Sequence, residues 1–102
     1  MKVRWTKRAR KEANKVAEYI FGSFGEKTYV EFLQEIEHLT SLMAEMPNIG
    51  ATETLLSDKI YLYRSLVVNK KSKIIYRIDG DIIHIVDFWD CHREPKSLTK
   101  DL

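Results

Sequence analysis

The chain has 102 residues, the length of a single domain, which excludes a large enzyme with its own cofactor domain. With 44% hydrophobic and 31% charged residues, its composition is that of a soluble globular protein rather than a disordered or membrane-spanning one. The single cysteine, Cys91, excludes an internal disulfide and a four-cysteine zinc site. Because we find neither a long apolar run nor a signal-peptide core, we expect a cytoplasmic protein with no membrane contact.

The net charge of +2 hides three blocks of different sign. Residues 1–15 carry seven Lys or Arg and one Glu, a sum of +6, whereas residues 16–57 carry seven Glu and one Lys, a sum of −6. Residues 58–102 carry nine bases and seven acids, a sum of +2. Such blocks are typical of solvated helix faces, but also of a basic surface for nucleic acid or an acidic partner. The charge alone leaves both interpretations open.

Two helices are expected in the first half of the chain. A short strand over residues 3–5 precedes Thr6, whose hydroxyl can cap a helix. Apolar residues then recur at helical spacing over residues 9–24 and again over residues 29–46, and Pro47 ends the second helix. The short connection between the two segments predicts an antiparallel helical hairpin.

The second half of the chain changes to the alternation of strands. Three strands, rich in Ile, Val and Tyr, are expected over residues 60–68, 73–78 and 82–89. Residues 69–72 form the first turn, and Asp79-Gly80 is a strong hairpin signal for the second.

The order of these elements predicts an α+β domain. We expect an N-terminal strand and an antiparallel two-helix hairpin packed on one face of an antiparallel β-sheet. A single domain is expected over residues 1–93, followed by a polar C-terminal tail over residues 94–102.

Side-chain alternation assigns each strand residue to one face of this sheet. With pairing across Asp79-Gly80 and a four-residue first turn, the apolar face that receives the helices collects Tyr63, Val67, Ile74, Tyr76, Ile78, Ile83 and Ile85. The opposite, open face collects Arg64, Lys73, Arg77 and His84 among Leu66, Ile75, Val86 and Phe88. A change of one residue in the first turn would reverse the face of Arg64.

The cations of the open face allow two interpretations. Long Lys and Arg side chains can simply cover apolar surface, or they can bind phosphates or an acidic peptide. His92, beside Arg93 and just after the last strand, can transfer a proton or contact a phosphate. Lys71 in the first turn and Phe88 complete the predicted RNA-binding or partner-binding residues. No metal-binding or cofactor motif is present, so we expect no cofactor.

From Val3 to Pro95 the chain resembles the RelE/ParE superfamily of type II toxin–antitoxin toxins. The opening VRWTKRARKEANKVAEYI is similar to the strand and helix with which that family begins. The hairpin KIIYRIDGDIIHIVDFWD, followed by His92-Arg93-Glu94-Pro95, resembles the end of its sheet. The resemblance implies a growth-inhibiting, plasmid-stabilising toxin that a cognate antitoxin neutralises.

The family resemblance also implies two possible targets. RelE-like members are ribosome-dependent mRNA endonucleases, and Lys73 stands here where they carry an arginine before the Ile74-Ile75-Tyr76 motif. Arg64 lies in the strand that supplies further cations, and His92-Arg93 match the terminal basic position. However, no tyrosine follows Trp89, which favours the ParE-like branch that inhibits DNA gyrase.

Three interpretations therefore stay open: a gyrase inhibitor, an endoribonuclease, and a non-toxic relative that only binds an antitoxin. In the nuclease, cations on the open face would stabilise charge on the scissile phosphate, with His92 as acid or base and without a metal. The predicted catalytic set is Arg64, Lys73, His92 and Arg93, assisted by Arg77. The antitoxin would cover exposed apolar groups of the sheet and the helical hairpin.

Overall fold

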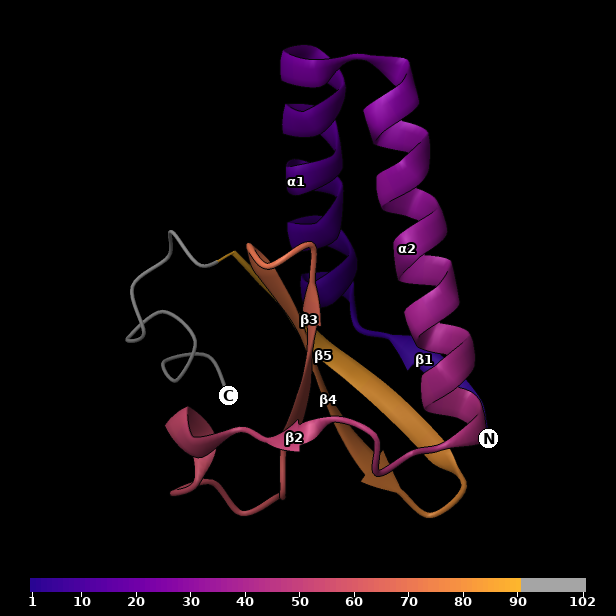
Figure 1. Cartoon of the computed structure of the whole chain (residues 1–102). Coiled ribbons are helices and arrows are strands. Elements are labelled where there is room, and N and C mark those ends of the chain that lie inside the picture. The colour runs from indigo at the N-terminus through magenta and orange to yellow at the C-terminus, as the bar shows by residue number, and fades with distance from the viewer. Residues whose placement is uncertain (91–102) are drawn as a thin grey trace.

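The computed structural model describes residues 1–90, and its elements follow the predicted order (Figure 1). The predicted tail over residues 94–102, together with Cys91, His92 and Arg93, lies outside the described residues. The elements are β1 (Lys2–Trp5), α1 (Lys7–Phe24), α2 (Glu26–Glu45), β2 (Ala51–Thr52), the 3-10 helix η1 (Thr54–Leu56), β3 (Arg64–Val68), β4 (Ser72–Asp79) and β5 (Ile82–Asp90). This arrangement confirms the α+β class.

The five strands form one mixed sheet in the order β1-β5-β4-β3-β2. The pairings of β3 with β4 and of β4 with β5 are antiparallel as predicted, and the unpredicted β2 adds an antiparallel pairing with β3, but β1 runs parallel to β5. The prediction of a fully antiparallel sheet is therefore wrong at this edge. The reason is topological, because β1 is separated from β5 by both helices and can enter the sheet in either direction.

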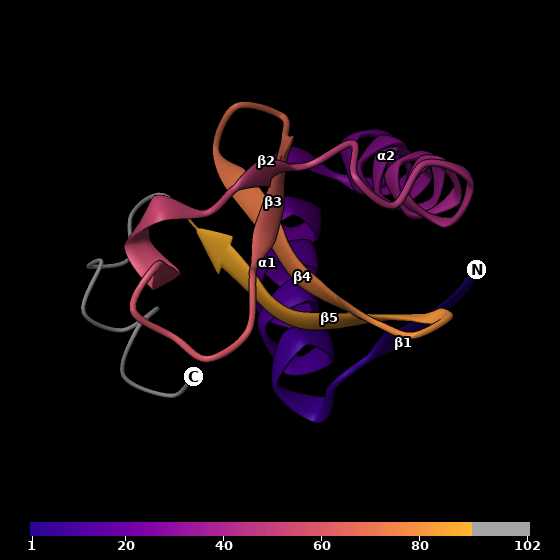
Figure 2. The same cartoon turned by 90° about the horizontal axis from the view of Figure 1, so that it is seen from below.

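A helical hairpin covers one face of the sheet. Three small residues at helical spacing, Ala9, Ala13 and Ala17, let α1 approach β5 closely, and α2 lies beside α1 with contacts to β1 and β3 (Figures 1 and 2). Gly25 connects the helices with φ of 89°, a left-handed conformation that glycine adopts without a steric cost. The far end of the hairpin extends beyond the sheet (Figure 1). None of the described helices is long and apolar enough to cross a membrane.

Two apolar clusters lie on opposite faces of the sheet. The larger, between sheet and helices, contains Ile74, Tyr76, Ile83 and Ile85 as predicted. The smaller cluster, on the open face, consists of Leu56, Tyr63, Ile75, Val86 and Trp89. Here the prediction for Tyr63 is wrong, since its side chain belongs to the open face.

The first turn explains the misplaced residues of β3. It contains three residues, Asn69–Lys71, rather than four, because Asn69 and Lys70 adopt positive φ angles and Val68 pairs with Ser72. A shift of one residue exchanges the faces of a strand. Val67, predicted to face the helices, is consequently exposed.

The same strand is shorter at its start than predicted. Residues 60–63 precede β3, because β2 has only two residues and pairs with Arg64 and Ser65 alone. Without a partner strand, Ile60, Tyr61 and Leu62 remain outside the sheet and exposed, and Ile60 retains 93% of its accessible surface.

A β-bulge at Val86 shifts the register of the last hairpin. Tyr76 pairs with Ile85 while Ile75 pairs with Asp87, so Val86 is the extra residue of β5. Beyond the bulge the faces are exchanged. Phe88 therefore lies in the core beneath the helices, against Phe32 at 5.8 Å between ring centroids, and not on the open face as predicted.

Candidate functional site

Three basic side chains form a row across the open face of the sheet. Arg77 of β4 lies directly opposite His84 of β5, and His84 lies opposite Arg4 of β1. Cross-strand partners point to the same face, and Val3 and Trp5 beside Arg4 pack into the core on the other face. The predicted placement of Arg77 and His84 on the open face is therefore confirmed.

Arg77 is the most constrained member of this row. Its guanidinium carbon lies 4.1 Å from the ring centroid of Tyr61, a cation–π contact, and its Nη1 lies 3.6 Å from a carboxylate oxygen of Asp79. The same oxygen lies 3.7 Å from Nε2 of His84. Nη1 of Arg77 is buried and has no hydrogen-bond partner among the described residues. Arg77 and His84 thus share one carboxylate, and the buried Nη1 offers no open surface to an external oxyanion.

Lys73, by contrast, is held in an ion pair. Its Nζ lies 2.8 Å from the Glu53 carboxylate and 5.0 Å from the ring centroid of Trp89. Burial raises the pKa of Glu53, but hydrogen bonds from Lys73 and from the backbone N–H of Leu55, with the charge of Lys73, bring this pKa below its ordinary value. The buried Glu53 carboxylate is therefore ionised near neutral pH and neutralises the charge of Lys73.

Arg64 lies on the wrong face for the predicted role. Because of the three-residue turn, it pairs with Tyr76 rather than facing Arg77. Its Nη1 donates to the backbone carbonyl oxygens of Gly50, at 2.8 Å, and Asn48, at 3.4 Å. Arg64 thus secures the loop that follows α2, and the prediction that it shares the open face with Arg77 is wrong.

The other predicted residues are spread over the molecule. Lys71 is exposed in the turn between β3 and β4, and Phe88 is buried in the core. His92 and Arg93 lie outside the described residues, so their predicted catalytic roles stay predictions. Within residues 1–90, no group of three metal-ligating side chains comes together.

Arg4, Tyr61 and Asp79 are the members of the site that the sequence analysis missed. Arg4 joins the row only through the parallel pairing of β1 with β5, which links residues about eighty positions apart. The sequence indicated the position of Arg4 only through the alternation of Val3, Arg4 and Trp5. In a strand this alternation places Arg4 on the face opposite to its two apolar neighbours.

The chain matches the family described as ParE toxin of type II toxin–antitoxin system, parDE, over residues 3–95. Among solved structures, it is similar to one described as a chromosomal ParDE toxin–antitoxin system from P. aeruginosa. The TM-score is 0.70 at 19% identity, with 88% of this chain and 95% of that chain covered. A YoeB/ParE toxin from Agrobacterium tumefaciens gives a TM-score of 0.60 at 18% identity, with 88% and 98% covered.

None of the curated proteins matches the chain significantly. At these identities the two solved structures establish the fold, while the family match extends over most of the sequence. The resemblance to the RelE/ParE superfamily is therefore confirmed, and the protein belongs to the ParE toxin family of type II toxin–antitoxin systems.

Proposed function

We propose that this protein is a growth-inhibiting toxin that acts on DNA gyrase and is neutralised by a cognate antitoxin. One observation supports gyrase over RNA as the target: two cations expected in a nuclease are engaged elsewhere. Lys73 is paired with the buried Glu53, and Arg64 binds carbonyl oxygens behind the sheet. Neither is left to stabilise charge on a scissile phosphate, which is the task of such cations in metal-free RNA cleavage.

A supercoiling assay with purified gyrase and relaxed plasmid tests the target. We expect the protein to inhibit supercoiling, and we expect Lys73→Met to inhibit as strongly when its folding is confirmed by circular dichroism. Supercoiling that is unaffected by a large molar excess of folded protein would reject gyrase as the target.

The row of Arg4, His84 and Arg77 favours a second candidate, ribosome-dependent mRNA cleavage. A guanidinium can bind a phosphate, and a histidine beside it can exchange a proton with the ribose 2′-OH. A cell-free translation reaction followed by primer extension on the message tests this candidate. Cleavage that His84→Gln and Arg77→Gln abolish, and that Lys70→Gln leaves intact, would replace gyrase inhibition as the proposed function.

A cognate antitoxin is proposed as the partner, since one structural relative comes from a ParDE toxin–antitoxin system. The exposed apolar side chains include Tyr19, Phe21 and Phe24 at the end of the helical hairpin, and Ile60 and Leu62 before β3. Apolar groups that remain in contact with water are typical of a surface that a partner covers. A third interpretation, a non-toxic relative, predicts normal growth when the protein is strongly expressed without its antitoxin.

A further inference from the structure

We propose that the outward side of α1 binds the phosphodiester backbone of duplex DNA. The binding surface, called the basic stripe here, consists of Lys7, Arg10, Lys11 and Lys15. The inference rests on the proposed function, because gyrase acts on duplex DNA and a toxin bound to it lies close to that duplex. It adds a ligand and a surface that are separate from the open face of the sheet.

The basic stripe is exposed and carries charge that the described part of the protein does not neutralise. All four side chains are exposed, while Ala9, Ala13 and Ala17 on the opposite side of α1 are buried. Lys7, Arg10 and Lys11 make no ion pair with another residue of the described range 1–90, and Lys15 has a single contact, 3.4 Å from Glu12. On the sheet, Arg77 and His84 both lie beside Asp79. On the basic stripe, Glu12 lies beside Lys15 and Glu18 lines the same surface, so the cations outnumber the acidic residues.

The position of these cations is unfavourable for the helix itself. The first turn of α1 contains no acidic residue, yet Lys7, Arg8 and Arg10 lie at its N-terminal end. The helix dipole is positive at that end, so cations there destabilise the helix. A polyanion bound along α1 reverses this effect, because its negative charge is attracted both by the side chains and by the dipole.

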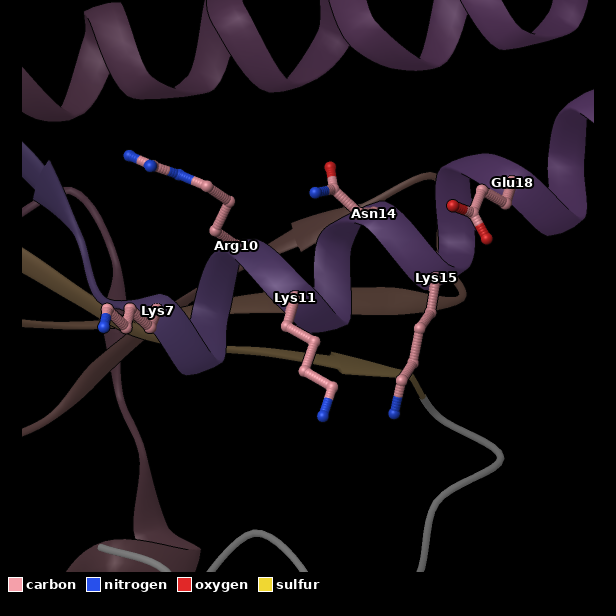
Figure 3. A pocket seen from close by; sticks show the side chains of 6 residues that line it. All are labelled: Lys7, Arg10, Lys11, Asn14, Lys15 and Glu18. Atoms are coloured by element: carbon pink, nitrogen blue, oxygen red, sulfur yellow. The ribbon is translucent and has the colours of Figure 1, made fainter.

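The geometry of the basic stripe suits an extended backbone of phosphates. Lys7, Lys11 and Lys15 are four residues apart, which places successive side chains about 6 Å apart along one line. With Arg10, Asn14 and Glu18 they line an open depression on the surface of α1. Figure 3 shows Lys11 and Lys15 pointing to one side of the helix and Arg10 and Asn14 to the other. Cations and an amide thus flank the depression, as is typical of phosphate contacts.

Fluorescence anisotropy with a labelled duplex of about 20 base pairs, over a range of salt concentrations, tests the inference on the full chain. The test variant reverses three charges on the basic stripe: Lys7→Glu, Lys11→Glu and Lys15→Glu. A control variant produces the same change in net charge elsewhere: Lys27→Glu, Lys59→Glu and Lys70→Glu. The test variant is expected to fold, because acidic residues near the start of a helix favour it.

We expect the test variant to raise Kd at least about tenfold and to reduce the salt slope by about 3, one unit for each phosphate that a stripe lysine no longer neutralises. The control variant should bind within about twofold of the parent protein. Equal weakening by both variants would show that overall charge, and not the basic stripe, determines binding. Undetectable binding by the parent protein at low salt would reject the proposal outright. Competition by polyglutamate as strong as that by unlabelled duplex would assign the surface to an acidic polypeptide, and tighter binding of duplex RNA would overturn the choice of DNA.

Gyrase inhibition, measured on the same variants, separates this inference from the proposed function. If the parent protein inhibits gyrase but binds no duplex, only the basic stripe proposal fails. If it binds the duplex through the basic stripe but leaves supercoiling unaffected, gyrase fails as the target and DNA binding remains.

Discussion

Glu53 is a carboxylate buried inside a small domain, and its charge links the stability of the fold to pH. Its pKa is raised by burial but lowered further by Lys73 and by the Leu55 N–H, so the folded value lies below the unfolded one. A group of this kind stabilises the folded state above its unfolded pKa, near 4.5, and that contribution is lost as pH falls through the folded pKa.

Removal of the Lys73 charge should therefore weaken the fold most at neutral pH. We expect Lys73→Met to lower the free energy of unfolding by about 2–3 kcal/mol at pH 7, because an ionised carboxylate then remains buried without its cation. The loss should shrink at about pH 3.5, where Glu53 is protonated in the variant. Urea unfolding at both pH values measures the effect, with Lys71→Met as the exposed control. An equal loss at both pH values would contradict this account of the pair.

Tyr76 secures the loop between α2 and β2. Its hydroxyl donates to the Pro47 carbonyl oxygen at 2.7 Å and accepts from the Gly50 N–H at 2.9 Å. Gly50 permits this approach, since a Cβ at that position would lie 2.7 Å from the hydroxyl oxygen.

We expect Tyr76→Phe to lower the free energy of unfolding by about 1–3 kcal/mol, because a buried donor and a buried acceptor lose their partner. Hydrogen exchange of the Gly50 amide should also become faster. Tyr19→Phe, on an exposed ring, is the matched control and should change neither quantity. Unchanged exchange at Gly50 would show that the hydroxyl does not hold the loop.

At the scale of elements, Thr6 joins the start of α1 to the bulge in β5. Its Oγ1 accepts from the Ala9 N–H at 3.1 Å and lies 3.3 Å from the carbonyl oxygen of Val86, to which it donates. The backbone N–H of Thr6 donates to the Ile85 carbonyl oxygen at 3.0 Å. Thr6 thus caps the helix and also donates hydrogen bonds to two backbone carbonyl oxygens at the bulge of β5.

Thr6→Ala is expected to lower the free energy of unfolding by about 1–2 kcal/mol, the usual effect of removing a helix cap. Thr6→Ser keeps the hydroxyl and should restore most of the loss. Thermal unfolding of both variants measures the difference, and an Ala variant as stable as the Ser variant would exclude the capping role.

The positions of the helices could be predicted from the sequence better than the register of the strands. The apolar periodicity of α1 and α2 extends over many residues, and Thr6 is the cap that the sequence predicted. Strand register depends instead on single residues. The positive φ of Lys70 has no signal in the sequence, and it shortened the first turn enough to move Arg64 to the other face. The bulge at Val86 moved Phe88 in the same way.

Arg77 and His84 were placed on the correct face despite an incorrect pairing. A two-residue turn at Asp79-Gly80, as predicted, would place Arg77 opposite Ile82, but Arg77 lies opposite His84, two residues further along β5. A shift of two residues leaves side chains on the same face, whereas a shift of one exchanges them. Local alternation therefore predicted this part of the site, and only the long-range pairing of β1 could supply Arg4.

At the scale of the whole molecule, basic side chains form two separate surfaces. The row of Arg4, His84 and Arg77 lies on the open face of the sheet, and the basic stripe lies on the outward side of α1. The exposed residues Tyr19, Phe21 and Phe24 lie at the end of the hairpin, whereas Ile60 and Leu62 flank Tyr61, whose ring stacks on Arg77 of the row. An antitoxin that covers Ile60 and Leu62 would therefore lie beside the row on the sheet.

Replacement of Ile60 and Leu62 together by Ser should therefore weaken antitoxin binding. We expect Kd for the cognate antitoxin to rise at least about tenfold, because these side chains bury apolar area only in the complex. The free toxin should keep its stability, since both residues are exposed. Isothermal titration calorimetry measures the affinity, and Leu55→Ser is a control at a less exposed apolar position. An unchanged Kd would move the antitoxin interface elsewhere.

The parallel pairing of β1 with β5 also sets the order in which the chain can fold. β1 can pair with β5 only after residues 82–85 have been synthesised, and α1 packs against the same strand. During synthesis the first 24 residues thus leave the ribosome long before the surface that buries them. Contacts so distant in sequence make folding slow relative to a helical protein of this size. Folding is therefore delayed until β5 has left the ribosome, and any activity that requires the folded domain appears only after that point.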